Sequence, residues 1–118
     1  ISWTMLVLAV ILCVAVEPAS SALLSGRKAG AHKIQGIGAN FIPGNFDAQV
    51  CDDIATVSDE EAMREMVSFG RETGILVGIS AGANIAAAKR YAAYYPGKTV
   101  VTIAPDGADK YLSVVEFE

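Results

Sequence analysis

Four apolar runs without alternation constrain the fold of this chain more than any other feature. Residues 11–16, 75–79 and 99–104 are mostly β-branched or apolar, and 54–57 is a shorter candidate of the same kind. Such runs are typical of strands covered on both faces of a parallel sheet. Because segments with helix signals lie between them, the sequence predicts an α/β fold with a mostly parallel sheet flanked by helices.

The clearest helix signal begins at Ser58. Ser58 and Glu61 form a capping box, and Asp59 and Glu60 place negative charge at the positive end of the helix dipole. Apolar residues then recur at helical spacing, and Gly74 is placed to end the helix as a C-terminal cap. We therefore expect a helix between Ser58 and Gly74.

A second helix is expected over the alanine-rich residues 83–94, with Pro96-Gly97 as its break. Residues 19–24 predict a short helix, and Glu17-Pro18 is expected to end the strand before it. The glycine-rich stretch 26–44 contains apolar residues that can anchor it. It therefore reads as a functional loop rather than a linker.

Composition excludes several classes of protein. A chain of 118 residues fits one domain, and 53% hydrophobic with 19% charged residues argues against disorder. The net charge is -4 and the basic residues are scattered singly, so we do not expect nucleic-acid binding. Cys13 and Cys51 lack the spacing of a zinc site, which predicts reduced thiols and no metal.

The apolar run 5–16 has two interpretations. Its 12 residues fall short of the roughly 20 that cross a bilayer, and no basic region precedes it. A buried strand is the main prediction, and a targeting or anchoring segment is the alternative. A membrane location is therefore not expected.

Three segments are candidates for a ligand site. Ligands of open parallel sheets gather beyond the carboxyl ends of the strands. Residues 78–82 and 105–107 follow predicted strands, and the loop 36–40 is a third candidate. We expect the Ser80 hydroxyl to project from this edge toward a cavity.

Residues 78–82 also fit the G-x-S-x-G pattern of serine hydrolases. That mechanism needs a histidine after the serine, whereas His32, the one histidine, precedes Ser80. The hydrolase is therefore rejected, and His32 is expected to be structural or solvent-facing. A simpler alternative is that Ser80 caps the helix that follows it.

The sequence around these candidates resembles a known family. Residues 32–43, His-Lys-Ile-Gln-Gly-Ile-Gly-Ala-Asn-Phe-Ile-Pro, are similar to the signature loop of cysteine synthases, the O-acetylserine sulfhydrylases. Residues 14–18, residues 74–83, and Pro105-Asp106 with the residues 111–113 match in the family's order. The resemblance runs from about Leu12 to Ser113.

The resemblance implies the fold and the reaction. Residues 12–118 would be the C-terminal part of the catalytic domain, within the large domain of the tryptophan synthase β-like (type II) fold, and residues 1–11 an apolar segment of unclear origin. The family's cofactor is pyridoxal 5'-phosphate, and its transferase reaction in cysteine biosynthesis turns O-acetylserine and sulfide into cysteine and acetate. Ser80 would bind the pyridine nitrogen of the cofactor, and Gly36 would lie at the substrate side of the entrance loop. Plain turn glycines are the alternative for Gly36 and Gly38.

The sequence also departs from the family. Asn40 stands where glycine is usual, Ala81 where a second serine is frequent, and residues 107–110 differ from the family's turn. No lysine lies in the family's Schiff-base context and no phosphate loop is evident. We therefore expect no catalytic residue here, and a chain that is inactive alone.

Several alternatives stay open for the function. The chain could be a non-catalytic relic or interaction module, a membrane-tethered small protein, or part of a cystathionine β-synthase or a serine or threonine dehydratase. The family implies an amino-acid substrate, a homodimer, serine acetyltransferase as a further partner, and a cytoplasmic location.

Overall fold

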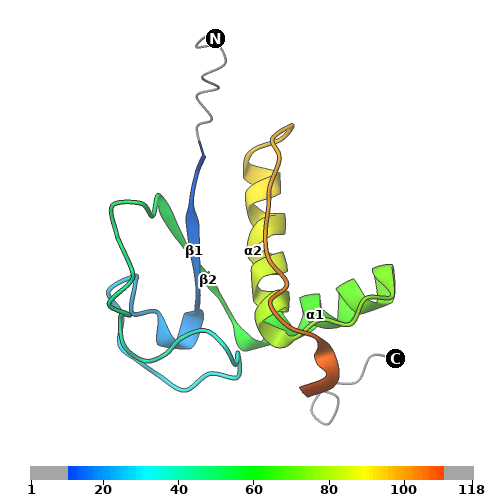
Figure 1. The fold of residues 1–118 in the computed structure, drawn as a ribbon, viewed down its shortest axis with the longest axis horizontal. Coiled ribbons are helices and arrows are strands. Elements are labelled where there is room, and N and C mark those ends of the chain that lie inside the picture. Colours follow the sequence, from blue (N-terminus) through cyan, green and yellow to red (C-terminus); the bar gives the residue numbers. More distant parts are fainter. Residues whose placement is uncertain (1–10, 111–118) are drawn as a thin grey trace, which may run out of the picture.

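The computed structural model describes residues 11–110, in which two strands and two helices form an α/β unit (Figure 1). The elements are β1 Val14–Pro18, a 3-10 turn at Ala19–Ser21, β2 Asp53–Val57, α1 Asp59–Thr73, α2 Ile79–Tyr94 and a 3-10 turn at Ala108–Lys110. The predicted α/β class is confirmed. Nearly all of the apolar segment 1–11, and the motif residues 111–113, lie outside the described residues.

The strands β1 and β2 pair in parallel, with Val14 opposite Asp53 and Pro18 opposite Val57. The predicted strand 54–57 is confirmed, and the first strand ends at Glu17-Pro18 as predicted, although it begins at Val14 rather than at Ile11 and includes Glu17 and Pro18 themselves. Pro18 is the last residue of β1, and β1 has a neighbour on one side only within the described residues. A proline, which has no N–H to donate, is tolerated in such an edge strand.

The helix predicted after Ser58 is confirmed as α1. The Ser58 side chain accepts a hydrogen bond from the Glu61 backbone N–H at 3.1 Å. Gly74 ends the helix in the left-handed conformation, with φ 76°, and donates its N–H to the carbonyl of Gly70. Both ends were therefore encoded locally.

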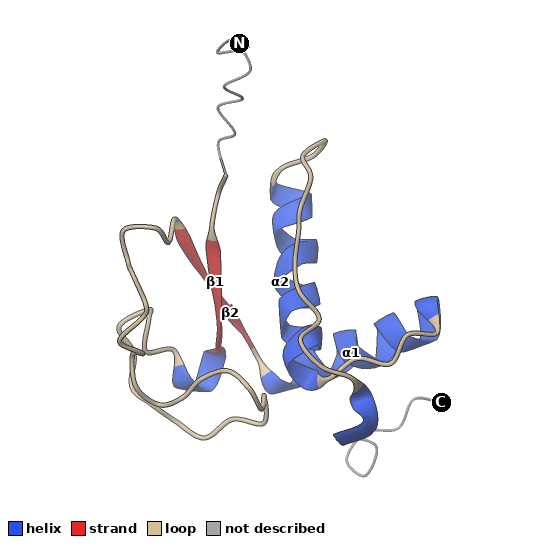
Figure 2. Cartoon of the chain, viewed as in Figure 1, coloured by secondary structure: helices blue, strands red, loops and turns tan. Residues whose placement is uncertain are grey.

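The second helix begins earlier than predicted, at Ile79 rather than at residue 83. Its N-cap is Gly78, and no side chain caps it, so the alternative that Ser80 is the helix cap is wrong. Figure 2 shows α2 standing beside the two strands, with α1 crossing near its first turn. The first half of α2 is buried. Small residues suit this half because they let the neighbouring elements pack close to the helix.

A close approach of backbones joins the two helices. A Cβ atom added to Gly82 would overlap the carbonyl oxygen of Ala62 and lie 3.0 Å from the backbone nitrogen of Met66. Met66 and Ala62 are fully buried at this crossing. The core extends from here to the strands and includes Ile34, Ala55, Val57, Val77, Ile79, Ala81, Ala83, Ala86 and Ala87.

Polar contacts fix α2 to its neighbours. Arg90 donates to the carbonyl of Thr56 at 3.0 Å and pairs with Glu61 at 3.2 Å. The Tyr91 hydroxyl donates a short hydrogen bond to the carboxylate of Asp53. Arg90 thus links α2 to both β2 and α1, and Tyr91 links it to β2.

Two predicted buried strands are wrong for the described structure. Residues 75–78 are extended but make only one bridge, between Val77 and Gly107, and Ile79 already belongs to α2. Residues 99–104 form no strand, and Val101 and Ile103 are 84% and 70% exposed. Strands form only where partner strands exist, and within residues 11–110 the single bridge at Val77 is the one strand-like pairing that these two runs make.

The predicted helix over 19–24 is shorter in the structure. Only Ala19–Ser21 forms a 3-10 turn, and the chain then turns through Gly26, which has φ 79°. Among the helices of residues 11–110, none has the length and apolar character required to cross a membrane.

We expect Gly82→Ala to destabilise the chain by roughly 2 kcal/mol, because the methyl group meets backbone atoms that cannot yield without separating the helices. This cost exceeds the gain in helix propensity of about 1 kcal/mol. Urea unfolding measures the change. Gly44→Ala is the control, since nothing lies within 4 Å of its added Cβ, and it should stay within about 0.5 kcal/mol. Equal midpoints for both variants would contradict the close helix crossing.

The contact between Tyr91 and Asp53 predicts a loss of stability in alkali. Burial, and then the hydrogen bond and negative charge of Asp53, raise the pKa of Tyr91 from 10.0 to about 12. A raised folded pKa stabilises the fold below the unfolded value, and this contribution disappears as pH rises from 10 to 12.

Tyr91→Phe should therefore show a shallower fall of the urea midpoint than the unmodified chain as the pH rises from 10.0 to about 12. Tyr95→Phe, which removes a hydroxyl from a ring that is 47% exposed, should keep the original slope. An unchanged slope in Tyr91→Phe would show that this contact does not control the alkaline transition.

Candidate ligand site at the first turn of α2

The three candidate segments meet at the first turn of α2. The Gly78 N–H donates to the carbonyl of Asp106 at 3.0 Å, and the Ala108 N–H donates to the carbonyl of Leu76 at 3.3 Å. These bonds hold the turn 105–107 against the start of the helix. The glycine loop approaches the same turn of α2 from the side of the strands (Figure 1). The sequence prediction that these segments converge is therefore confirmed.

Gly36 lies directly against Ser80. A Cβ atom added to Gly36 would lie 3.7 Å from the Ser80 hydroxyl oxygen and 3.8 Å from its Cβ. Gly36 has φ 99°, a conformation that residues with a side chain rarely adopt. The loop can therefore present bare backbone beside the hydroxyl.

Ser80 itself is buried, with 3% of its surface exposed. Ser80 does not line either of the two pockets described below, one under the glycine loop and one on α1. The prediction that its hydroxyl projects toward a cavity is therefore wrong for these two pockets of residues 11–110. The reason is the early start of α2, which places Ser80 in the first turn of the helix and beneath Gly36.

His32 holds the glycine loop together from within. Its Nδ1 accepts the backbone N–H of Ile34 at 3.2 Å, and its Nε2 lies 2.8 Å from the carbonyl oxygen of Gly38. Because Nδ1 is an acceptor, Nε2 carries the proton and donates to Gly38. A Cβ on Gly38 would lie 2.6 Å from Pro18 Cγ, so no larger residue fits there. The prediction of a structural histidine agrees with this geometry.

Asn40 fixes the end of the loop. It has φ 63°, a conformation that asparagine accepts more readily than most residues with a side chain, which explains how it can stand where the family has glycine. The Ser21 hydroxyl donates to Asn40 Oδ1 at 2.8 Å and accepts the Gly30 N–H at 3.3 Å. Ser21 is 1% exposed whereas Asn40 is exposed, so this link ties the surface end of the loop to a buried side chain.

Glu17 orders the turn beneath the loop and was missed by sequence reasoning. Its carboxylate accepts the N–H of Leu24 at 2.8 Å, the N–H of Ser25 at 3.0 Å and the Ser25 hydroxyl at 2.6 Å. Glu17 is 4% exposed. A charged residue at the end of an apolar run was the available signal, because a buried carboxylate needs several donors.

A cavity of about 630 Å³ lies between the glycine loop and this turn. Its lining is mostly apolar and comes from residues 16–24, 36–39 and 41–46. The volume suits a small molecule, and the bare backbone of Gly36 and Gly38 borders it. The candidate site therefore consists of the glycine loop, this cavity and the first turn of α2.

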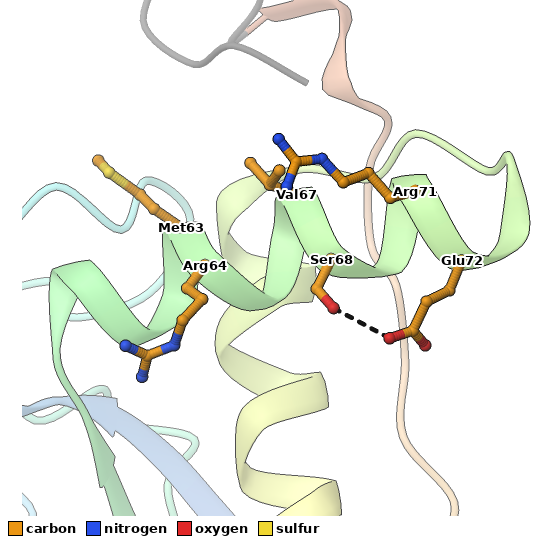
Figure 3. A pocket seen from close by; sticks show the side chains of 6 residues that line it. All are labelled: Met63, Arg64, Val67, Ser68, Arg71 and Glu72. Carbon is orange, nitrogen blue, oxygen red and sulfur yellow. Dashed lines mark hydrogen bonds between the residues drawn. The ribbon is translucent and has the colours of Figure 1, made fainter. Parts of the chain in front are cut away.

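A second hollow lies on the outer face of α1 (Figure 3). It is lined by Met63, Arg64, Val67, Ser68, Arg71 and Glu72, and Ser68 donates to Glu72 at 3.1 Å. All of these residues come from one helix, so no opposing element encloses a ligand. We assign no site there. Within residues 11–110 no group of His, Cys, Asp and Glu could hold a metal ion.

The geometry defines an α/β unit in which a glycine loop lies against the first turn of a helix and forms a candidate ligand site. The family model described as pyridoxal-phosphate dependent enzyme matches residues 7–106. The chain belongs to this family.

The relatives are cysteine synthases. Cysteine synthase B of Campylobacter jejuni is 48% identical over 100 residues, which cover 85% of this chain and 33% of the relative. Cysteine synthase of Staphylococcus aureus is 46% identical over 101 residues, with the same coverage. The chain therefore spans about a third of the length of the curated relatives it matches.

Solved structures agree with this relationship. The cysteine synthase of Entamoeba histolytica matches with a TM-score of 0.84 and 39% identity, over 88% of this chain and 31% of that protein. The O-acetylserine dependent cystathionine β-synthase of Helicobacter pylori matches with a TM-score of 0.81 and 43% identity, over 87% and 34%. The tryptophan synthase β-like fold expected from the sequence is confirmed for the matched part.

Substitution of His32 tests how the loop is held. In His32→Ala both hydrogen bonds of the ring are lost, and each costs about 1 kcal/mol, or roughly fivefold in local opening. Asparagine at this position can still accept the N–H of residue 34 in an Asx turn but cannot reach Gly38.

Hydrogen exchange should therefore show the Ile34 amide exposed in His32→Ala and protected in His32→Asn, while residues 36–40 loosen in both variants. Equal protection of Ile34 in the two variants would contradict the assigned role of Nδ1.

Proposed function

We propose that this chain forms part of a cysteine synthase, which makes cysteine and acetate from O-acetylserine and sulfide. The observation that carries the proposal is the glycine loop seated on Ser80, within a chain that is 48% identical to a cysteine synthase. The glycine loop, the first turn of α2 and the turn 105–107 lie close together, which is necessary if they form a single ligand site. A cytoplasmic location belongs to this proposal.

Ser80 fits the role of cofactor contact. Its hydroxyl is buried against a glycine and is not used for capping α2. A neutral hydroxyl can form a hydrogen bond with the ring nitrogen of pyridoxal phosphate, but it does not stabilise a positive charge on that nitrogen as a carboxylate would. The cofactor supplies an electron-withdrawing ring for elimination and replacement on an amino acid. Ser80 orients that ring, and burial of the hydroxyl strengthens the contact.

Gly36 fits the role of substrate contact. Its backbone borders both Ser80 and the cavity, and it has no side chain that would separate substrate from the ring. His32 and Asn40 act as positioning residues, since they hold the loop without facing its ligand side. This sequence shows neither a lysine in the family's Schiff-base context nor a phosphate loop. We therefore expect no turnover by this chain alone.

The partners follow from the same proposal. A small amino acid is the substrate, a second copy of the whole domain gives the homodimer, and serine acetyltransferase is a further partner. A second function has one observation in its favour: the Helicobacter pylori cystathionine β-synthase is 43% identical, against 39% for the Entamoeba cysteine synthase. That enzyme also uses O-acetylserine, according to its description.

A chimera tests the proposal. Residues 12–118 replace the matched third of the Campylobacter jejuni cysteine synthase B, so that all parts of the domain lie on one chain. We expect it to bind pyridoxal phosphate and to form cysteine from O-acetylserine and sulfide. Cysteine formation is measured beside cystathionine formation with homocysteine, and a preference for homocysteine would favour the second function.

Ser80→Ala in this chimera should weaken pyridoxal-phosphate binding roughly tenfold, as expected for one lost hydrogen bond to the ring. Cofactor absorbance measured during titration gives the affinity. Ser68→Ala, on the outer face of α1, is the matched control and should bind normally. Equal cofactor affinity in both variants would remove Ser80 from the proposed site.

A further inference from the structure

His32 is the one histidine of the chain, and its ring joins two parts of the glycine loop. The ring is half-buried, and both of its nitrogens contact backbone groups. Nδ1 accepts the N–H of Ile34 at 3.2 Å, and Nε2 lies 2.8 Å from the carbonyl oxygen of Gly38. The stretch between these two backbone groups is therefore held at both ends by one side chain.

Only the neutral ring can make both bonds. Nδ1 accepts the Ile34 N–H only while it carries no proton, and Nε2 then carries the single ring proton and donates it to Gly38. In the protonated ring both nitrogens are donors, so an N–H at Nδ1 would face the N–H of Ile34. Ile34 has no exposed surface, so water cannot replace the lost acceptor unless the loop opens.

Protonation would also strengthen one contact of the ring. A charged N–H at Nε2 donates a stronger hydrogen bond to the Gly38 carbonyl than a neutral one. The loss at Nδ1 is larger, because two donors would meet at 3.2 Å and the buried N–H of Ile34 would keep no acceptor. Protonation of His32 therefore favours an opened loop.

No carboxylate offsets a positive charge on the ring. Among residues 11–110, neither ion pair includes His32. The buried carboxylate of Glu17, on β1, is bonded to the turn that follows that strand. Asp59, at the start of α1, accepts the backbone N–H of Lys33 at 3.0 Å. The acidic groups of the neighbouring elements are thus bonded elsewhere.

The other neighbours of the ring are basic or uncharged. Arg27, Lys28 and Lys33 are exposed on the same stretch of chain. Residues 79–82, the first turn of α2, contain no charged residue. The surroundings of His32 therefore favour the neutral ring over the protonated one.

The backbone of the loop connects His32 to the candidate site. Gly36 lies midway between Ile34 and Gly38, the two residues that the ring holds. A Cβ atom added to Gly36 would lie 3.7 Å from the hydroxyl oxygen of Ser80. Loss of the bond at Ile34 would therefore remove a support of the segment that lies against Ser80.

We propose that His32 is a pH-sensitive latch: its neutral ring holds the glycine loop against Ser80, and its protonation releases the loop. Histidine changes its charge between about pH 5 and about pH 8. Because the closed loop needs the neutral ring, the latch is complete at the upper end of this range and is lost as the pH falls. The latch is a property of the loop itself. Only its effect on cofactor binding rests on the proposed function.

Measurements on the full 118-residue chain test the latch. With the one histidine isotope-labelled, nitrogen NMR at about pH 8 should show a proton on Nε2 and none on Nδ1. Hydrogen exchange is then followed from about pH 8 to about pH 5, with each rate divided by the intrinsic rate at that pH. We expect Ile34 and residues 36–40 to lose protection roughly tenfold, while β1, β2 and α1 keep theirs.

Two variants separate the latch from ordinary weakening of the loop. His32→Asn can still accept the N–H of residue 34 but carries no titratable group, so protection of Ile34 should not depend on pH. Ser21→Ala removes the hydrogen bond to Asn40 but keeps the ring. Its loop should therefore be looser at every pH and still show the same pH step.

Four outcomes would overturn the proposal. They are a proton on Nδ1 at about pH 8, protection of Ile34 that is unchanged down to about pH 5, an equal pH step in His32→Asn, and an even loss of protection over all elements. The last outcome would mean general unfolding rather than release of the loop.

The chimera extends the test to cofactor binding. Since a ligand binds only molecules with a closed loop, the affinity for pyridoxal phosphate should fall between about pH 8 and about pH 5. This fall should be at least about twofold larger than in the chimera with His32→Asn, in which the titration of the cofactor itself is the same. An equal fall would overturn the link to binding. A chimera that binds no cofactor at any pH would count against the proposed function, while exchange on the chain alone still decides the latch.

Discussion

The position of the first turn of α2 is the constraint on which the rest of this structure depends. Gly82 lets α1 approach it, Gly78 donates to Asp106, and Gly36 lies over Ser80. Gly82 has no room for a Cβ atom and Gly36 has φ 99°, so neither position tolerates a side chain. A shift of this turn would separate the helices and the three ligand-site segments at once. Packing and the candidate site therefore share one structural cause.

The glycine loop shows how a long loop becomes rigid without secondary structure. Gly36, Gly38 and Asn40 all have positive φ, a conformation that costs glycine little and asparagine less than most residues. The side chains of His32 and Ser21 then satisfy loop polar groups from the inside. This leaves the outer backbone available to a ligand. The polar residues of the loop fix its geometry, while Gly36 and Gly38 leave bare backbone beside the cavity.

Local signals predicted α1 completely, because Ser58 and Gly74 each act within one turn of the helix. The start of α2 was predicted too late, since Gly78 has no capping side chain and burial of small residues, rather than local propensity, decides where it begins. The family resemblance assigned Ser80 and Gly36 to the same site, and the structure agrees, since a Cβ atom added to Gly36 would lie 3.7 Å from the Ser80 hydroxyl oxygen. The link from Ser21 to Asn40 spans 19 residues and has no sequence pattern.

The errors at 75–79 and 99–104 have a single physical reason. An apolar run indicates that a strand is buried on both faces, but it does not indicate which residues bury it. Helices satisfy their backbone internally, so α1 and α2 form wherever their caps and packing allow. A strand depends on a neighbour that can lie anywhere in a domain. This chain matches about a third of the length of its relatives. Its two helices are formed, whereas the β-branched run 99–104 forms no strand and leaves Val101 and Ile103 exposed.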